Sequence, residues 1–149
     1  MTESSLRLDH QLCHRFYTAS NAFTRAYRPL LKPLNLTYPQ YIVLMGLWEQ
    51  DKISILELIK QTQIDGGSLS LILDKLKAKG LLNISPSAQD KRKRIIQLTP
   101  QGVKLKTQAI KIPGLMWCKM NNLTEQEALT LIQLIDKVNL DLKSAQKPE

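Results

Sequence analysis

The sequence contains few residues that could bind a metal or form a structural disulfide. Its 149 residues include two cysteines, 105 positions apart, and two histidines. Two cysteines are too few for a disulfide framework or a four-ligand zinc site, and two histidines add little. We therefore expect no metal and no other cofactor, and any cysteine chemistry is expected to be redox chemistry.

Long apolar runs are absent as well. No apolar stretch approaches the roughly 20 residues that cross a bilayer, and residues 1–10 lack the basic-then-apolar order of a secretory signal. These absences predict a soluble, cytoplasmic protein without a membrane partner. A length of 149 residues and a hydrophobic content of 43% suit one compact domain, so we expect a single domain over residues 1–149.

Positive charge is in excess and is concentrated in one segment. Lysine and arginine number 21 against 13 acids, which gives a net charge of +8. Residues 74–94 alone hold seven bases and two acids, a net charge of +5. Such a segment attracts polyanions and gains affinity for DNA by releasing condensed counterions. A merely solvated, lysine-rich surface would have the same composition.

Apolar residues in the first part of the chain recur at helical spacing. Alternating steps of four and three predict a long helix over residues 6–31 that is ended by Pro29 and Pro33. Residues 37–40 combine a capping threonine, a first-turn proline and a glutamine three positions after the cap, which begins a second helix running to about residue 48. The apolar positions of the first helix are Leu12, Phe16, Ala19, Phe23, Ala26 and Leu30.

Two short helices joined by a tight turn are expected next. One covers residues 53–62, and the other opens at about residue 66 and stops at Lys79-Gly80. Leu69, Ile72, Leu73 and Leu76 form the apolar face of the second, which leaves Ser68, Ser70, Asp74 and Lys75 on its free face. This pattern is typical of a helix-turn-helix, in which Ser68, Ser70 and Lys75 would contact the major groove. An ordinary helical hairpin has the same pattern.

The following segment favours the helix-turn-helix. Residues 81–86 and 94–98 have strand character and flank a polar turn. A basic hairpin directly after a candidate recognition helix is the arrangement of a winged helix, with the hairpin tip in the minor groove. We expect Arg92 in the minor groove and Asp90 orienting Arg92, because phosphates would repel the carboxylate. Contacts with phosphates are expected from Lys91, Lys93 and Arg94.

The remaining residues are expected to form helices. Thr99-Pro100 begins a helix to about residue 111, Pro113-Gly114 interrupts it, and residues 124–127 form a capping box for the last helix. The long apolar faces of the first and last helices predict a homodimer, which suits two-fold-symmetric DNA sites. The predicted fold class is thus all-α with a small β-hairpin wing. It comprises a winged helix-turn-helix over about residues 37–99 between dimerisation helices at about 6–36 and 100–149.

This order of elements, with Asp90-x-Arg92 and Leu98-Thr99 in the wing, resembles the MarR family of bacterial transcription regulators over nearly the whole chain. The first 41 residues are similar to its organic hydroperoxide resistance repressors (OhrR). The motifs that carry this narrower resemblance are Gln11-Leu12-Cys13, Tyr17, Tyr27-Arg28-Pro29-Leu30-Leu31 and Leu36-Thr37-Tyr38-Pro39-Gln40-Tyr41.

The resemblance implies a repressor whose reduced dimer binds a pseudo-palindromic operator in double-stranded DNA. It also implies that organic hydroperoxides oxidise Cys13, that Tyr17, Tyr27 and Tyr38 hydrogen-bond its sulfur, and that Cys118, of the partner chain, then forms a disulfide with it. Two departures from the family pattern stand out. His14 replaces a usual phenylalanine, and residues 66–72 differ from the typical Ser-Gly-Thr-Leu-Thr-Pro-Leu.

The residues around Cys13 can be judged without the family. Tyr17 lies one turn after Cys13 on the same helical face. Hydrogen bonds from phenols favour the thiolate, which is the form that attacks a peroxide. Tyr27 lies about 21 Å along a straight helix from Cys13, at ~1.5 Å per residue. It could therefore reach only the partner chain's sulfur. The alternative is that Cys13 and the tyrosines simply pack in the core.

Two other functions compete with the redox repressor. One is a MarR-type repressor that a small phenolic ligand releases from DNA, with the cysteines incidental. The other is a thiol peroxidase enzyme. The sequence argues against an enzyme, because the basic hairpin would have no role and no C-x-x-C or thioredoxin-like pattern is present.

Overall fold

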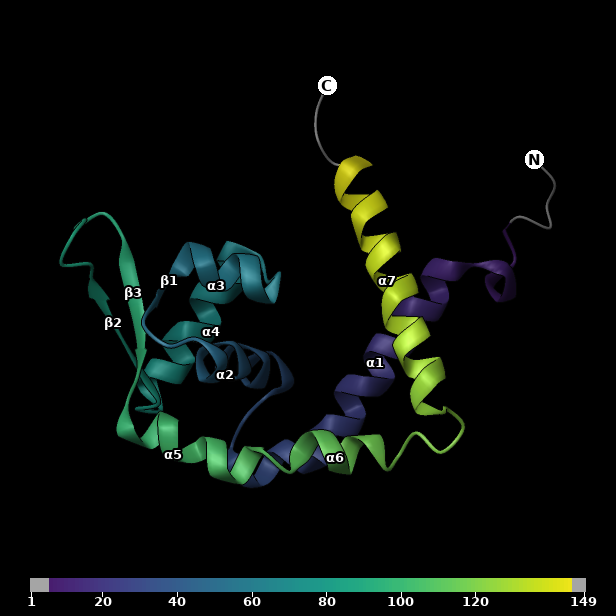
Figure 1. The fold of residues 1–149 in the computed structure, drawn as a ribbon, viewed down its shortest axis with the longest axis horizontal. Coiled ribbons are helices and arrows are strands. Elements are labelled where there is room, and N and C mark those ends of the chain that lie inside the picture. The colour runs from purple at the N-terminus through teal and green to yellow at the C-terminus, as the bar shows by residue number, and fades with distance from the viewer. Residues whose placement is uncertain (1–5, 146–149) are drawn as a thin grey trace. The chain divides into compact units, whose positions relative to one another are not determined.

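The structure, a computed structural model, describes residues 6–145 and is mostly helical with one small sheet (Figure 1). The chain divides into two compact units, residues 1–113 and 114–149. The predicted class, all-α with a small β-hairpin wing, is confirmed. The helices are α1 (Leu12–Leu31), α2 (Tyr38–Glu49), α3 (Ile55–Thr62), α4 (Gly66–Ala78), α5 (Pro100–Ala109), α6 (Ile112–Trp117) and α7 (Glu125–Ala145).

Side-chain caps fix where several helices begin. The Thr37 hydroxyl accepts a hydrogen bond from the Gln40 backbone N–H while the Gln40 side chain accepts from the Thr37 N–H, so the capping box predicted for α2 is confirmed. Ser54 and Glu57 form a second capping box at α3, which the sequence analysis missed. Such caps satisfy backbone donors that the first helical turn leaves without partners.

The sheet has three antiparallel strands in the order β1-β3-β2 (Figure 1). β2 (Leu82–Pro86) and β3 (Arg94–Leu98) form the predicted hairpin. β1 (Ile53–Ser54) was predicted as the first turn of a helix, and that prediction is wrong. Ile53 pairs with Ile96 and is buried, so tertiary pairing decides the conformation of two residues that are too few to show a strand pattern.

Helix boundaries differ from the prediction at three places, one near the start of the chain and two near prolines. α1 begins at Leu12 rather than at residue 6, because residues Leu8–His10 form a separate 3-10 turn, η2, followed by extended backbone at Gln11. Pro29 lies inside α1, which continues for two more residues into a second 3-10 turn, η3 (Lys32–Leu34). The interruption predicted at Pro113-Gly114 lies slightly earlier, because α5 ends at Ala109 and α6 begins at Ile112, with Pro113 in its first turn. A proline ring is tolerated in the first turn of a helix, as at Pro113 in α6, because the backbone donors there have no partners within the helix.

The core of the first unit lies between the helix-turn-helix and the sheet. Leu69, Leu73 and Leu76 of α4 are almost fully buried, which confirms the predicted inner face of that helix. They belong to one apolar cluster with buried residues of α2, α3 and β3. Burying a leucine side chain contributes about 1.5–3 kcal/mol, so this cluster holds the exposed face of α4 in a fixed position.

Two polar contacts tie the other helices to this core. The Trp48 indole Nε1 donates to the Gly102 carbonyl at 2.9 Å, which joins α2 to α5. Lys79, just after α4, donates from Nζ to the Asn35 carbonyl and, at 2.9 Å, to Gln40 Oε1. Burial, and to a smaller degree the nearby charge of Lys75, lowers the pKa of Lys79. The end of α4 is therefore anchored to the start of α2.

Gly102 allows α5 to pass close to the chain before β2. A Cβ built at this position would lie 2.0 Å from the Leu81 carbonyl oxygen. We predict that Gly102→Ala lowers the free energy of unfolding by about 1–3 kcal/mol, because the backbone must shift. Urea denaturation measures this. Gly114→Ala is the control, since its Cβ would meet nothing within 4 Å, and equal stability of the two variants would contradict the close contact.

α7 in the second unit begins with the predicted capping box of Thr124 and Glu127, which is confirmed. Its apolar side chains are largely exposed in the single chain; these include Leu129, Leu131, Ile132, Leu134, Leu140 and Leu142. On α1, Leu12 and Phe23 are exposed too, at 61% and 41%. Within residues 6–145, no helix is long and apolar enough to cross a membrane. The division of the chain into dimerisation and DNA-binding parts stays a prediction.

Candidate nucleic-acid interface and redox site

α3, the turn after it and α4 form a helix-turn-helix. Gln63 ends α3 with a left-handed backbone, φ 58°. Asp65 then caps α4 by accepting a hydrogen bond of 2.8 Å from the Ser68 N–H. Hydrogen bonds with Ser68 lower the pKa of Asp65, so this cap is ionised at neutral pH. The predicted contact residues Ser68, Ser70 and Lys75 are all exposed on α4.

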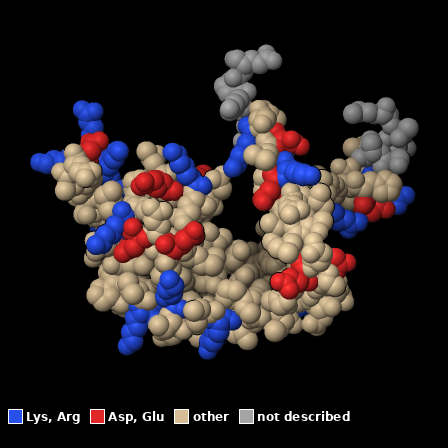
Figure 2. Space-filling model, in the orientation of Figure 1, with Lys and Arg blue, Asp and Glu red and all other residues tan. Residues whose placement is uncertain are grey.

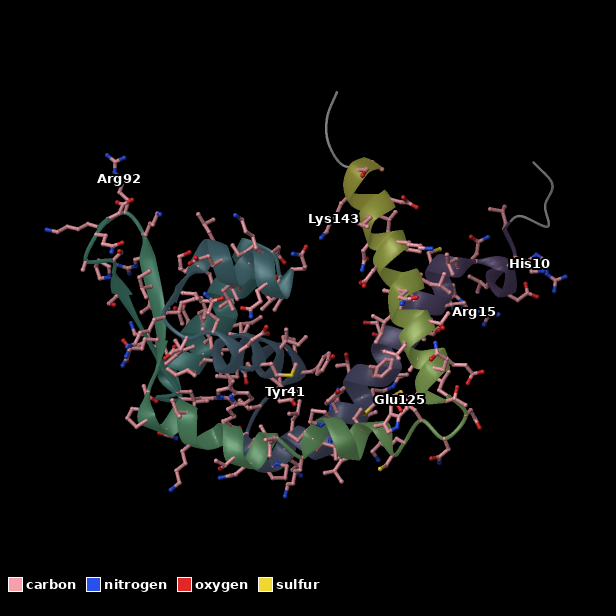
Figure 3. The ribbon with its side chains drawn as sticks, viewed as in Figure 1. His10, Arg15, Tyr41, Arg92, Glu125 and Lys143 are labelled. Atoms are coloured by element: carbon pink, nitrogen blue, oxygen red, sulfur yellow. The ribbon has the colours of Figure 1, made fainter. Side chains whose placement is uncertain are left out.

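The wing is the hairpin of β2 and β3 with its connecting turn. Backbone hydrogen bonds from Ser87 N to Lys93 O and from Lys93 N to Asp90 O close the turn, at 2.8 and 2.9 Å. Figure 2 shows Lys and Arg side chains gathered at the wing, at the upper left, and Figure 3 places Arg92 at its tip. The four predicted basic residues, Lys91, Arg92, Lys93 and Arg94, are all exposed.

Asp90 was predicted to orient Arg92, and in the structure it contacts the backbone of Arg92. Its Oδ1 accepts a hydrogen bond of 3.0 Å from the backbone N–H of Arg92, which stabilises the turn. Among the described residues the one ion pair joins Arg7 to Asp9, so the Arg92 guanidinium has no acidic partner within salt-bridge distance. Asp90 therefore shapes the backbone on which Arg92 stands and leaves the charge of Arg92 free.

Cys13 lies in the first turn of α1 and is exposed as a free thiol. Tyr17, one turn later, is 68% exposed. Within the described part of the chain, no hydrogen bond joins the Cys13 sulfur to any tyrosine. α1 is unbroken from Leu12 to Leu31, so Tyr27 stands about 21 Å along it from Cys13 at ~1.5 Å per residue. A single chain does not bring Cys13 and Tyr27 together.

The chain does bring Tyr27 and Tyr38 together. Their rings stack with centroids 4.5 Å apart, and Tyr41 lies 6.0 Å from Tyr27 in a tilted arrangement. Burial, followed by the mutual influence of the three phenols, raises the pKa of Tyr27, and burial raises that of Tyr38. Both phenols are therefore neutral at physiological pH and keep the O–H that can donate to a thiolate. Tyr41 was not among the predicted site residues, although it follows Tyr38 by three residues, close to one helical turn.

These raised pKa values predict that the protein becomes less stable at alkaline pH. In the unfolded chain tyrosines ionise near pH 10, at a lower pH than Tyr27 and Tyr38 in the folded protein. The stability that the neutral tyrosines contribute is therefore complete below pH 10 and is lost as the pH rises through their pKa values in the folded protein. We expect the free energy of unfolding to fall between pH 9 and 11, and to fall less steeply in Tyr27→Phe. Urea denaturation across this range measures the slope. Equal slopes in the two proteins would contradict the assignment to Tyr27.

Cys118 directly follows α6 and is also an exposed free thiol. Its backbone N–H donates to the Gly114 carbonyl at 3.0 Å. Residues 6–145 contain no group of three or more His, Cys, Asp or Glu side chains able to hold a metal ion. His14 stands next to Cys13, and its Nδ1 is buried without a hydrogen-bond partner in the described structure.

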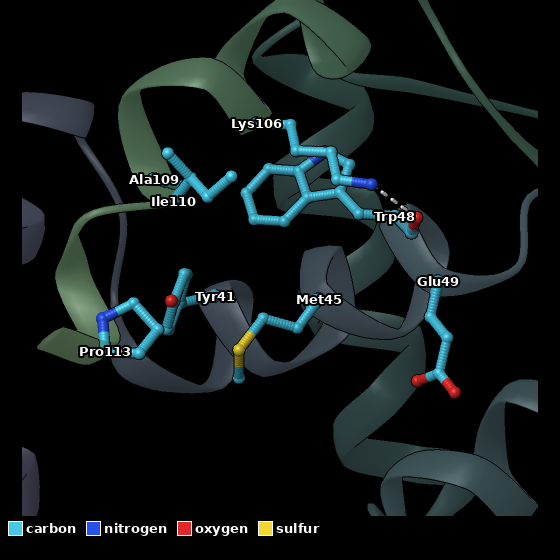
Figure 4. A pocket seen from close by; sticks show the side chains of 8 residues that line it. All are labelled: Tyr41, Met45, Trp48, Glu49, Lys106, Ala109, Ile110 and Pro113. Atoms are coloured by element: carbon cyan, nitrogen blue, oxygen red, sulfur yellow. Dashed lines mark hydrogen bonds between the residues drawn. The ribbon is translucent and has the colours of Figure 1, made fainter.

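Residues of α2 and α5, with Ile110 and Pro113, line a cavity that is open to solvent and that the sequence did not reveal (Figure 4). Its volume is about 280 Å³, and Lys106 closes one side by donating from Nζ to the Trp48 carbonyl at 3.0 Å. Apolar residues on two helices give no sequence signal that separates a cavity lining from a filled core. The lining consists of Tyr41, Met45, Trp48, Glu49, Lys106, Ala109, Ile110 and Pro113.

The fold and the helix-turn-helix with its wing define a class of transcription regulator, and comparisons agree. Residues 25–109 match the family described as "Transcriptional regulator SarA/Rot". The organic hydroperoxide resistance transcriptional regulator of Bacillus subtilis (strain 168) is 38% identical over 109 residues, which cover 73% of this chain and 74% of that protein. The chain belongs to the MarR family of transcription regulators, within its OhrR-like branch.

Solved structures with the same fold come from regulators of two kinds. Reduced AbfR bound to DNA is 26% identical with a TM-score of 0.81, covering 99% of this chain and 100% of that chain. BpsR of Bordetella bronchiseptica, whose DNA binding is regulated by 6-hydroxynicotinic acid, is 25% identical with a TM-score of 0.82, covering 89% of this chain and 96% of that chain.

Proposed function

We propose that the protein is a dimeric, redox-sensing transcriptional repressor. The reduced dimer binds a pseudo-palindromic operator, and oxidation of Cys13 by an organic hydroperoxide releases it. The observation that carries the DNA-binding part is the wing: four exposed cations, Lys91 to Arg94, stand on the hairpin that follows α4 in the chain, without an acidic side chain paired to them in the described residues. The likeness to reduced AbfR on DNA supports this placement.

The uncovered apolar faces support a dimer. α7 leaves six large apolar side chains at least 45% exposed, and Leu12 and Phe23 on α1 are exposed as well. Exposed apolar surface of this kind marks protein interfaces, and a two-fold dimer would place two recognition helices on a symmetric operator. In the dimer, the Tyr27 and Tyr38 phenols of one chain would donate hydrogen bonds to the Cys13 sulfur of the other.

The proposed reaction runs in two steps. The Cys13 thiolate attacks one oxygen of the hydroperoxide, which breaks the O–O bond, releases an alcohol once a proton is supplied, and leaves a sulfenic acid. The Cys118 thiolate then attacks that sulfur and breaks the S–O bond, so that the disulfide forms and hydroxide leaves, taking up a proton from solvent to become water. Cys118, which we assign to the partner chain, thereby protects Cys13 from further oxidation. Tyr17, Tyr27 and Tyr38 lower the pKa of Cys13 by stabilising its charged form.

One experiment tests the redox proposal directly. The purified protein is treated with cumene hydroperoxide, and the same samples are analysed on a non-reducing gel and in a DNA mobility-shift assay. We expect a disulfide-linked dimer and the loss of the DNA complex to appear together and to reverse with dithiothreitol. Release of DNA without any disulfide in the wild type would contradict the role of Cys118, and a disulfide without release would contradict the redox switch.

The cavity between α2 and α5 supports a second candidate function. Its aromatic and apolar lining, with Lys106 and Glu49 at the rim, would accommodate a small phenolic ligand that shifts the dimer away from its DNA-binding form. The likeness to BpsR favours this candidate. Met45→Trp, which fills the cavity, would abolish a response to such a ligand but leave the peroxide response intact, as mobility-shift assays with each effector would show.

A further inference from the structure

The outward face of α4 carries an apolar side chain at its centre. Leu71 is 65% exposed, whereas Leu69 and Leu73, two positions away on either side, are 0% and 1% exposed. Two positions along an α-helix correspond to a rotation of about 200°, so Leu71 points almost directly away from the core. Gly67 lies one turn before Leu71 on this face and Lys75 one turn after.

Neither the backbone conformation nor a contact within the protein requires glycine at position 67. Its backbone φ is not positive, and an added Cβ would meet only Asp65 Oδ1, at an ordinary contact distance of 3.4 Å. Glycine in a helix is unfavourable compared with alanine. A glycine on the outer face of a helix leaves room for another molecule to approach the backbone closely.

We propose that Leu71 contacts the C5-methyl groups of thymines in the major groove, at a close approach that Gly67 permits. The inference rests on the proposed DNA binding and names a base preference for it. Thymine is the one base of DNA that presents a methyl group in the major groove, and apolar side chains recognise it there. Lys75, one turn further on along the same face, is placed to reach into the same groove, as proposed for it above.

The test uses uracil, which pairs as thymine does but lacks the methyl group. Duplexes that bind the reduced, full-length protein are selected from a random pool, and each thymine is then replaced by uracil in turn. We expect one replacement in each half-site to weaken binding about fourfold, the value of one buried methyl group, and both together about fifteenfold. Leu71→Ala should bind thymine and uracil duplexes equally, whereas Leu71→Met should keep part of the discrimination.

Matched variants separate base contact from a change in folding. Val103→Ala removes a similarly exposed apolar side chain from α5 and should leave the thymine preference unchanged. Gly67→Ala should keep or raise the melting temperature while weakening DNA binding about tenfold, because its methyl group occupies the contact. Gly66→Ala, whose Cβ would lie beside Ile59 at 3.6 Å, should bind DNA normally.

The outcomes distinguish the inference from the function on which it rests. If the wild type selects duplexes but binds uracil and thymine probes equally, or if Leu71→Ala keeps the discrimination, the methyl contact is wrong and DNA binding stands. If the reduced wild type selects no duplex, the proposed function fails and the contact fails with it.

Discussion

Cys13→Ser binds operator DNA with the affinity of the reduced wild type and keeps that affinity when cumene hydroperoxide is added. The hydroxyl that replaces the thiol is similar in size and lies on an exposed first turn of α1, so folding is not disturbed. A serine hydroxyl does not form a sulfenic acid, so the step that starts release is missing. A mobility-shift titration at increasing peroxide concentration measures the loss of response.

Cys118→Ser is the matched control for this prediction. It retains the thiol that reacts first but removes the thiol that would form the disulfide. We expect it to leave DNA at the first exposure to peroxide and to recover poorly with dithiothreitol, because Cys13 proceeds to irreversible acids. A Cys13→Ser protein that still leaves DNA in response to peroxide would refute the sensor and direct attention to the cavity between α2 and α5.

Periodicity and caps predicted most of the helices. The capping box at Thr37 and the buried stripe of α4 depend on residues within one or two turns of each other, so the sequence carries their signal locally. β1 could not be predicted in this way, because Ile53 is a strand residue only through its pairing with Ile96, 43 positions later. Ser54 caps α3, which begins at the next residue. The helical pattern of the following residues therefore led to the prediction of a helix that includes Ile53.

The candidate site shows the same limit more clearly. The resemblance pointed to Cys13 and the tyrosines, and helical spacing placed Cys13 and Tyr17 on one face of a helix. Nothing in the spacing predicted the stacked pair of Tyr27 and Tyr38, which depends on how α1 packs against α2. The orientation of Asp90 toward the Arg92 backbone is likewise a property of the turn. Local patterns thus indicate candidate residues, whereas the mutual positions of those residues follow from packing.

Arg92→Ala weakens operator binding at least about thirtyfold, because each of two wings loses a base-groove contact of ~1–3 kcal/mol. The estimate follows from the exposed position of Arg92 at the wing tip, where its side chain has no protein partner to replace DNA (Figure 3). The free energy of unfolding should not change, since exposed side chains contribute little to it. Fluorescence anisotropy with a labelled operator measures the affinity, and urea denaturation checks the fold.

Three variants separate the charge of Arg92 from its shape and position. Arg92→Lys keeps the charge but lacks the planar guanidinium, so we expect it to bind nearly as weakly as Arg92→Ala. Lys91→Ala removes an expected phosphate contact and should reduce the slope of log affinity against log salt by about one. Lys104→Ala, an exposed cation on α5, should change neither quantity. If Arg92→Ala bound the operator with unchanged affinity, the wing would lie outside the DNA interface.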